Sequence, residues 1–562
     1  MPDLPSDALP RQVADAYLDD LIELDPTLGT YLGTPASARF LPDYSPAGAA
    51  AQAELARAAL ARLAEAEAQP GADADTERRC ARLLRERLVA YLAVYEADEH
   101  LRAVSNINSP AHSIREAFML MPKDTDEDYA DMAARLRAVP AALDGYCASL
   151  TEGLARNLPA GPRQVGTVVQ QLTEWVGDGV SESWFAQLTA EGPQDMRADL
   201  ASAATEATAA YAGLRDWLRD TYAPAVKDAP DVVGRARYAR WARFWNGSDT
   251  DLDEAYAYGW SEYHRLHAEM VAEAAKILPG KAPWQVLEHL DEHGHAVEGV
   301  EEVREWLQAL MDEAIEALDG THFELADGIK HVESRIAPPG SAAAAFYTPP
   351  SEDFTRPGRT WLPTRGQTRF PTYNLVTTWY HEGVPGHHLQ LAQWVHVARN
   401  LSRYQATAGM VSANAEGWAL YAERLMDELG FYTDPERRLG HLDAQMLRAI
   451  RVIIDIGMHL GLKIPAHSPF HPGERWTPEL ALDFFCRHSG LPGEHIDSEL
   501  TRYLGMPGQA IGYKLGERAW LTGRAAARAA HGDAFDAKSW HMAALSLGSL
   551  GLDDLVKEIS AL

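Results

Sequence analysis

The chain has 562 residues, of which 46% are apolar and 23% are charged, a composition typical of a globular protein with a large core. Its 81 acidic and 51 basic residues give a formal net charge of −30. Because this charge repels phosphate backbones and anionic membrane surfaces, we expect neither a nucleic-acid partner nor a membrane partner.

The cysteines and the N-terminal sequence bear on the cellular compartment. Cys80, Cys147 and Cys486 are isolated and odd in number, which favours a reducing compartment. The first twenty residues contain no basic region followed by an apolar one, and no apolar run is long enough to cross a bilayer. We therefore expect a soluble cytoplasmic protein, whose oligomeric state the composition does not indicate.

Helical periodicity dominates most of the chain. Apolar residues recur every three or four positions in the segments 50–68, 78–104, 195–220, 252–276, 299–318, 407–430 and 437–462. The stretch 330–364 is instead rich in Pro, Gly and β-forming residues, and it predicts a short strand or hairpin with long loops. We expect an all-α, mostly helical fold with one small β element. Its two lobes would be a helical N-terminal region, 1–329, and a catalytic region, 330–562, within one integrated fold.

The sequence "WYHEGVPGHHLQ" (379–390) begins like the zinc-binding helix of many peptidases. In that helix a second histidine stands four residues after the first, but here the position is occupied by Pro385. On a straight helix, His381 and His387 would differ by about 120° in direction and about 9 Å along the axis. They could not then bind one ion.

Pro385 and Gly386 predict that the helix is not straight. Pro385 lacks the amide that would bond the carbonyl of His381, and its ring collides with that carbonyl. Gly386 permits unusual backbone dihedral angles. A kink or bulge that loops out two residues would bring His387, or else His388, into the place of the missing ligand. The alternative is a chance His-Glu dipeptide followed by two surface histidines.

The segment "NAEGWALYAERL" (414–425) offers a third ligand on a predicted helix. Glu416 adjoins Gly417, which leaves room for a close helix approach, so we prefer Glu416 as the carboxylate that completes a zinc site. Glu423, seven residues later, lies near the same face and would support the site from behind. The alternative for either residue is a solvated acid on a helix surface.

Two C-terminal segments carry further candidates. In "RAIRVIIDIGMHLG", Arg451, Asp455 and His459 share one helix face. Arg451 and Asp455 predict a salt bridge, while His459 is either a ligand for substrate or oxyanion, or a packed core histidine.

The segment "ELTRYLGMPGQAIGYKLG" (499–516) supplies the last group, which is Arg502, Tyr503, Gln509 and Tyr513. A phenol or a cation aimed at a developing oxyanion assists hydrolysis through a tetrahedral intermediate. We therefore regard Tyr503 and Tyr513 as alternative oxyanion donors.

Taken in order, these motifs resemble a bacterial family known only as a domain of unknown function, number eight hundred eighty-five. The resemblance rests on "HEGVPGHHLQ", "EGWALYAERL", "DIGMH" and "RY…PGQAIGYKLG", extends to "AYLDDLIELDPTLGTYLG" and "FYTPPSEDFTRPG", and spans most of the chain. It implies a two-lobed, zincin-like architecture of the gluzincin type with a central cleft, and a zinc metallopeptidase activity. Members of the family are often secreted or lipid-anchored, whereas this sequence shows no signal.

Carried over residue by residue, the resemblance puts zinc on His381, Glu416, and His387 or His388. We prefer His387, because Gly386-His387 is similar to the Gly-His end of many helical peptidase motifs. The pair Arg502-Tyr503 is similar to an Arg-Tyr pair of dipeptidyl carboxypeptidases, in which the tyrosine stabilises the oxyanion.

We therefore expect a zinc-dependent hydrolase of peptide or peptide-like amide bonds that acts on short peptides. Glu382 would act as general base and then as general acid beside the Zn²⁺ site. Tyr503 or Tyr513, with His459, would stabilise the oxyanion.

Substrate binding is assigned to Arg502 and to the segment "AAAAFYT" (342–348), which contains Phe346 and Tyr347 and would pair with an extended peptide as an added strand. Two alternatives remain open. The same site could hydrolyse a non-peptide amide in a small-molecule pathway, or the fold could be a catalytically inactive binding protein.

Overall fold

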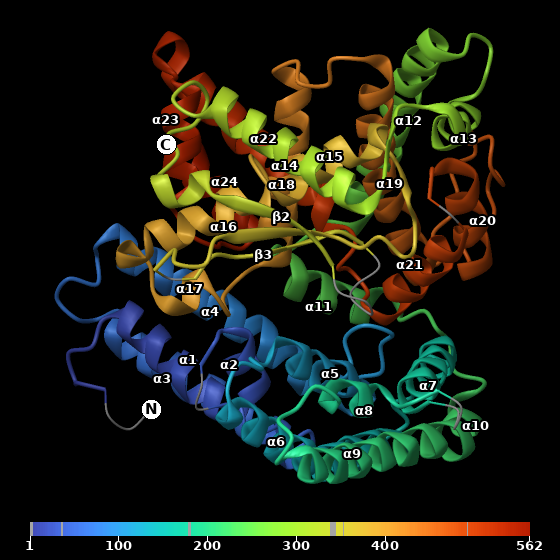
Figure 1. The fold of residues 1–562 in the computed structure, drawn as a ribbon. Coiled ribbons are helices and arrows are strands. Elements are labelled where there is room, and N and C mark those ends of the chain that lie inside the picture. Colours follow the sequence, from blue (N-terminus) through green and yellow to red (C-terminus); the bar gives the residue numbers. More distant parts are fainter. Residues whose placement is uncertain (1–3, 35–36, 178–180, 338–343, 352, 492) are drawn as a thin grey trace. The chain divides into compact units, whose positions relative to one another are not determined.

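The computed structural model describes residues 4–34, 37–177, 181–337, 344–351, 353–491 and 493–562. Helices account for most of these residues, and strands are few and short (Figure 1). The contacts divide the chain into two compact units, the first formed by residues 1–240 with 498–507 and the second by 241–497 with 508–562.

The first unit is built from helices alone in the part of it that the structure describes. Its elements are α1 (Pro10–Leu24), α2 (Pro26–Tyr31), α3 (Pro46–Ala66), α4 (Asp75–Glu96), η2 (Glu99–Arg102), α5 (Pro110–Leu120), α6 (Asp126–Ala155), α7 (Pro162–Val176), α8 (Trp184–Thr189), α9 (Arg197–Trp217), η3 (Leu218–Tyr222) and α10 (Ala223–Val226). The helices α11 (Gly234–Asn246) and α21 (Gly493–Gly505) contain residues of both units.

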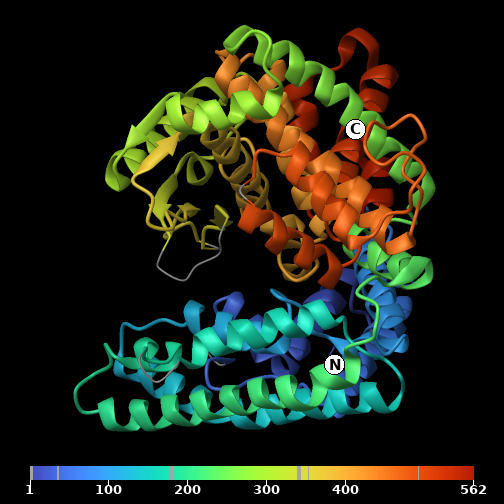
Figure 2. The same cartoon turned by 90° about the vertical axis from the view of Figure 1, so that its right-hand side faces the viewer.

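The long helices α6 and α9 pack side by side in this unit (Figures 1 and 2). The N-terminus of α6 is fixed by reciprocal hydrogen bonds between Thr125 and Asp128, and three acids in its first turn suit the positive end of the helix dipole. Buried apolar side chains such as Phe118, Leu136 and Tyr211 form one continuous core between the helices. Burial of this core stabilises the unit.

The second unit contains the remaining helices and all the strands. Its helices are α12 (Leu252–Ile277), α13 (Pro283–His293), α14 (Val300–Leu318), η4 (Asp327–Lys330), α15 (Thr372–Glu382), α16 (His387–His396), η5 (Ala398–Asn400), α17 (Arg403–Ala406), α18 (Ser412–Glu428), α19 (Pro435–Leu460), α20 (Pro478–His488), α22 (Gly512–His531), η6 (Gly532–Ala534), α23 (Ala537–Leu545) and α24 (Leu552–Ser560). Its strands are β1 (Ala296–Glu298), β2 (Val332–Ile336), β3 (Phe346–Thr348), β4 (Gly358–Leu362) and β5 (Arg369–Pro371).

The strands form two small sheets. In the larger one, β4 pairs in parallel with β2 and antiparallel with β3, so that β3 lies at an edge (Figure 1). In the smaller one, β1 pairs antiparallel with β5, and α15 begins directly after β5. The last strand of the smaller sheet therefore directly precedes the motif helix in the sequence.

Glycines allow two helix pairs of the second unit to approach closely. A Cβ at Gly417 on α18 would lie 2.4 Å from the Cα of Gly516 on α22, and a Cβ at Gly516 would lie 2.1 Å from the carbonyl oxygen of Ala413. Likewise, a Cβ at Gly440 on α19 would lie 2.1 Å from the carbonyl oxygen of Tyr373 on α15. The close helix approach predicted at Gly417 is thus present.

The predicted fold class, mostly helical with a minor β element, is confirmed, and each of the seven predicted helical segments overlaps a helix. The helix expected over 78–104 ends earlier, at Glu96, because Asp98 adopts a left-handed conformation with φ of 57°. Among the described residues, no helix is both long and apolar enough to cross a membrane.

The two predicted lobes, 1–329 and 330–562, stay a prediction. By contacts, residues 241–329 group with the motif-bearing region. The reason is that α12 packs along α19 of the motif-bearing region. At the contact, a Cβ at Gly259 would lie 3.0 Å from Val452.

Candidate metal centre

The motif helix breaks in the middle of the motif. Helix α15 ends at Glu382, and α16 begins at His387 after the four-residue loop 383–386. The Gly386 amide still donates to the carbonyl of Tyr380, at 3.0 Å. The predicted deformation is therefore present, as a complete interruption rather than a two-residue bulge.

Contacts from other helices hold this loop in place. The indole of Trp418 on α18 donates to the carbonyl oxygens of Pro385 and Gly386, at 2.9 and 3.1 Å. The amide of Val384 contacts the sulfur of Met311 on α14 at 3.1 Å. A side chain at residue 386 is sterically excluded, because its Cβ would lie 1.9 Å from the carbonyl oxygen of His381. The loop conformation thus requires a glycine there.

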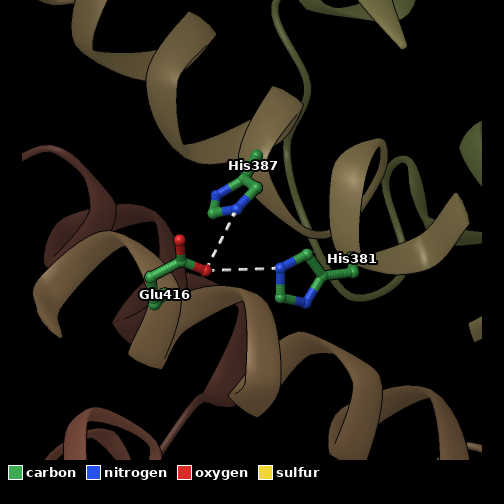
Figure 3. A group of neighbouring side chains, drawn as sticks. All are labelled: His381, His387 and Glu416. Carbon is green, nitrogen blue, oxygen red and sulfur yellow. Dashed lines mark ion pairs between the residues drawn. The ribbon is translucent and has the colours of Figure 1, made fainter. Parts of the chain in front are cut away.

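The break brings three metal-binding side chains together. Figure 3 shows one carboxylate oxygen of Glu416 facing both imidazoles. This oxygen, Oε2, lies 3.4 Å from His381 Nε2 and 3.5 Å from His387 Nε2. The two imidazole rings are 4.8 Å apart between centroids and nearly perpendicular. Among the described residues these three form the one group of at least three His, Cys, Asp or Glu side chains whose ligand atoms all lie within 4.8 Å of one another.

This geometry suits zinc. Two ligands with bonds of about 2.1 Å at a tetrahedral angle lie about 3.4 Å apart, which matches both measured separations. The oxygen that faces both imidazoles, Glu416 Oε2, is buried and has no hydrogen-bond partner. A buried carboxylate oxygen without a donor is costly unless a cation satisfies it. Two neutral imidazoles and one carboxylate are also a donor set typical of catalytic zinc.

Glu423 orients the first histidine. Its Oε1 accepts a hydrogen bond of 2.7 Å from Nδ1 of His381, which leaves the Nε2 lone pair directed at Glu416. Its other oxygen accepts from Gln445 Nε2 at 3.0 Å, and the carboxylate is fully buried. A carboxylate behind a ligating histidine fixes the tautomer and raises the basicity of the imidazole.

The charges at the centre oppose the effect of burial. Burial disfavours the ionised form of Glu416, but the imidazoles of His381 and His387 beside it outweigh this effect and hold the pKa of Glu416 well below its usual range. Burial would lower the pKa of His381, yet the carboxylates of Glu416 and Glu423 beside it raise that pKa to about 9. Without a metal the site therefore holds a proton that an incoming cation must displace.

Glu382 follows His381 as the last residue of α15. Burial raises the pKa of its carboxyl group, while the nearby imidazoles of His381 and His387 oppose this shift. The side chain is 8% exposed. A carboxylate beside a metal site with a raised pKa is a better proton acceptor than an ordinary carboxylate.

His388 has a structural role. It is fully buried, its Nε2 donates to the carbonyl of Ile329 at 2.7 Å, and its Nδ1 accepts from the hydroxyl of Tyr347 at 2.9 Å. Burial lowers its pKa to about 4, so it is neutral at pH 7. Both ring nitrogens are occupied, and the geometry favours His387 over His388 as the second metal-binding histidine.

The two predicted substrate-binding aromatics pack within the small sheet. Tyr347 holds His388, and Phe346 stacks on Trp361 with ring centroids 5.9 Å apart. Both lie on the edge strand β3, whereas residues 342–343 of the predicted strand-forming segment lie outside the described residues. A substrate role for Phe346 and Tyr347 stays a prediction.

The oxyanion candidates are distributed over both units. Tyr513 lies on α22 in the second unit, where the guanidinium of Arg451 stacks over its ring at 4.6 Å. His459 is buried, with Nε2 3.5 Å from Asp455 Oδ1, as expected of a packed histidine. Arg502 and Tyr503 belong to the first unit, where both interact with Glu499. Their catalytic roles stay predictions.

Three residues that support the site were missed at the sequence level: Trp418, Gln445 and Lys514. Trp418 fixes the loop, and Lys514 donates to Gln445 behind Glu423. A lysine within the apolar, glycine-rich start of α22 was a visible signal, since a lysine is rarely buried without a partner. The identity of its partners depends on long-range packing.

The family of bacterial proteins of unknown function DUF885 matches residues 26–559. The chain belongs to this family. Among solved structures, a putative lipoprotein from Colwellia psychrerythraea is similar with a TM-score of 0.84 and 22% identity, covering 99% of each chain. A putative lipoprotein of unknown function from Shewanella oneidensis has a TM-score of 0.75 and 18% identity, covering 98% of this chain and 100% of that one. At such low sequence identity, these two comparisons show only that the DUF885 chain and the two solved proteins share a fold. No curated protein matches.

Proposed function

We propose that the chain is a zinc-dependent hydrolase of peptide or peptide-like amide bonds, with short peptides as substrates. The observation that carries the proposal is the convergence of His381, His387 and Glu416 at tetrahedral ligand spacing, next to the carboxylate of Glu382. His381, His387 and Glu416 would hold Zn²⁺.

The metal and the protein residues would have separate roles. When bound, zinc supplies a Lewis acid that polarises the scissile carbonyl and lowers the pKa of a bound water toward about 7. Glu382 would accept a proton from the attacking water at its carboxylate and then donate it to the leaving nitrogen. Glu423 would keep the Nε2 lone pair of His381 in place throughout.

Two further roles are part of the proposal. Tyr513, with His459, would donate to the oxyanion of the tetrahedral intermediate, while roles for Tyr503 and Arg502 of the first unit stay predictions. The edge strand β3 would bind substrate, since within the described residues β3 pairs on one side only and its free edge suits an extended peptide. Strand addition favours short, unstructured peptides.

Substitution of Glu382 by Gln tests the proposal. We expect purified protein loaded with one zinc per chain to cleave members of a short-peptide panel, and Glu382→Gln to lower the rate by at least about 100-fold with zinc content unchanged. Glu288→Gln, an exposed position on α13, is the matched control and should retain full activity.

The same panel separates the alternatives. Cleavage of small non-peptide amides alone would indicate a small-molecule pathway, and zinc binding without any hydrolysis would indicate a binding protein. Hydrolysis that is unaffected by Glu382→Gln would show that Glu382 is not the general base.

The cytoplasmic location expected from the sequence stays a prediction. The names of the two similar solved proteins, both putative lipoproteins, do not support it.

A further inference from the structure

A buried chain of hydrogen bonds continues from the metal centre into α22. Gln445 on α19 donates from Nε2 to Glu423, at 3.0 Å, and accepts at Oε1 from Lys514 Nζ, at 2.8 Å. Glu423 in turn accepts from His381 at 2.7 Å. Each of these four residues is at most 5% exposed, so water does not compete for the hydrogen bonds.

Lys514 is held firmly in this chain. Besides Gln445, its ammonium contacts Glu517 Oε2 at 2.5 Å and Glu262 Oε2 at 3.1 Å. The ammonium, which can only donate, thus has a hydrogen bond with Gln445 and ion pairs with two carboxylates. The charge of the fully buried Lys514 is therefore compensated, and the position of its nitrogen is fixed.

This arrangement determines which way the amide of Gln445 faces. An ammonium only donates and an ionised carboxylate only accepts. Oε1 of Gln445 must therefore face Lys514, and Nε2 must face Glu423. The reverse orientation would place two donors against each other at one end and two acceptors at the other.

Gln445 is the hydrogen-bond donor to Glu423 Oε2 within the described residues. Two charged or titratable groups nearby, His441 Nδ1 at 3.9 Å from Oε2 and Arg448 Nη2 at 3.9 Å from Oε1, both lie beyond hydrogen-bond distance. His441 is neutral at pH 7, because burial lowers its pKa to about 4. The rotation of the Glu423 carboxylate thus depends on Gln445.

We propose that Gln445 and Lys514 are positioning residues of the metal centre: Lys514 orients the Gln445 amide, which holds Glu423 in the rotamer that directs His381 Nε2 at the metal. The inference rests on the proposed function and deepens it. Neither residue touches the metal or the substrate. Their effect reaches the site through two hydrogen bonds.

Zinc affinity of Gln445 variants tests the inference. Gln445→Met removes the donor to Glu423, and Gln445→Glu keeps an acceptor for Lys514 but sets a second carboxylate against Glu423. We expect both to weaken zinc binding by about tenfold or more in competition with a chelator, as loss of a partner behind a metal ligand does elsewhere. The visible absorption spectrum of the cobalt-substituted protein should change as well, because it reports ligand geometry.

Gln405→Met is the matched control. Gln405 is an equally buried glutamine that caps α17, so its loss should lower the melting temperature while zinc affinity stays within about threefold. The inference is overturned if Gln445→Met binds zinc within about threefold of wild type with an unchanged cobalt spectrum, or if Gln405→Met weakens zinc as much. Wild-type protein that binds no zinc would instead refute the proposed function itself.

Discussion

Replacement of Gly386 by Ala tests directly how the broken helix assembles the site. The added methyl group would lie 1.9 Å from the carbonyl oxygen of His381 and 2.5 Å from that of Tyr380, both of them backbone atoms. A Cβ essentially never approaches another heavy atom closer than 3.0 Å, so the backbone at residues 381 and 386 must separate by about 1.1 Å.

This displacement is large compared with what a metal site tolerates. Ligand distances in metal sites vary by about 0.2 Å, and His387 directly follows the residue that moves. We expect Gly386→Ala to weaken zinc binding by at least about tenfold and to lower the free energy of unfolding by about 1–3 kcal/mol.

Chelator competition and thermal denaturation measure the two effects. Gly213→Ala on α9 is the control, because a Cβ there meets nothing within 4 Å. In the middle of a helix this substitution should stabilise the protein by about 0.5–1 kcal/mol and leave zinc binding unchanged. The steric argument is refuted if Gly386→Ala binds zinc as tightly as Gly213→Ala and does not melt at a lower temperature.

Two further predictions concern pH. Because the pKa of His381 is raised to about 9, a zinc ion must displace its proton below that pH; apparent affinity should fall by about tenfold per unit from pH 9 to 7, and a flat profile would contradict the assignment. Burial raises the pKa of Asp443 to about 6 in the folded state, against 3.8 unfolded, so its favourable contribution to folding is present below pH 3.8 and is lost as pH rises through 6. Asp443→Asn, which keeps an acceptor for the Gly490 amide, should therefore stabilise the protein at pH 7.5, by at most about 3 kcal/mol, and by about half as much at pH 5. An equal melting-temperature difference at both pH values would refute this.

How far the site could be predicted from the sequence differs from residue to residue. Helix geometry alone showed that His381 and His387 cannot share an ion across an intact helix, and Pro385 showed where the helix must change. The extent of the break could not be predicted, because the loop 383–386 is held by Trp418 and Met311 from helices far away in the sequence. Local pattern carries no information about such partners.

The fold shows the same limit. Periodicity located the helices because an amphipathic helix must bury one face, whichever neighbour covers it. The neighbours themselves were not predictable: the packing of α12 along α19, which groups residues 241–329 with the motif-bearing region, leaves no trace in the periodicity. Buried ionic partners such as Lys514 and Glu517 likewise become apparent only when distant helices are brought together.

The central claim is that His381, His387 and Glu416 bind one zinc ion. The most direct test is a crystal structure of the zinc-loaded protein with anomalous scattering measured on both sides of the zinc edge. The account predicts a single peak bonded to Nε2 of both histidines and to a carboxylate oxygen of Glu416, at about 2.0–2.2 Å. No peak among these three side chains, or a zinc ion held by other residues, would contradict it.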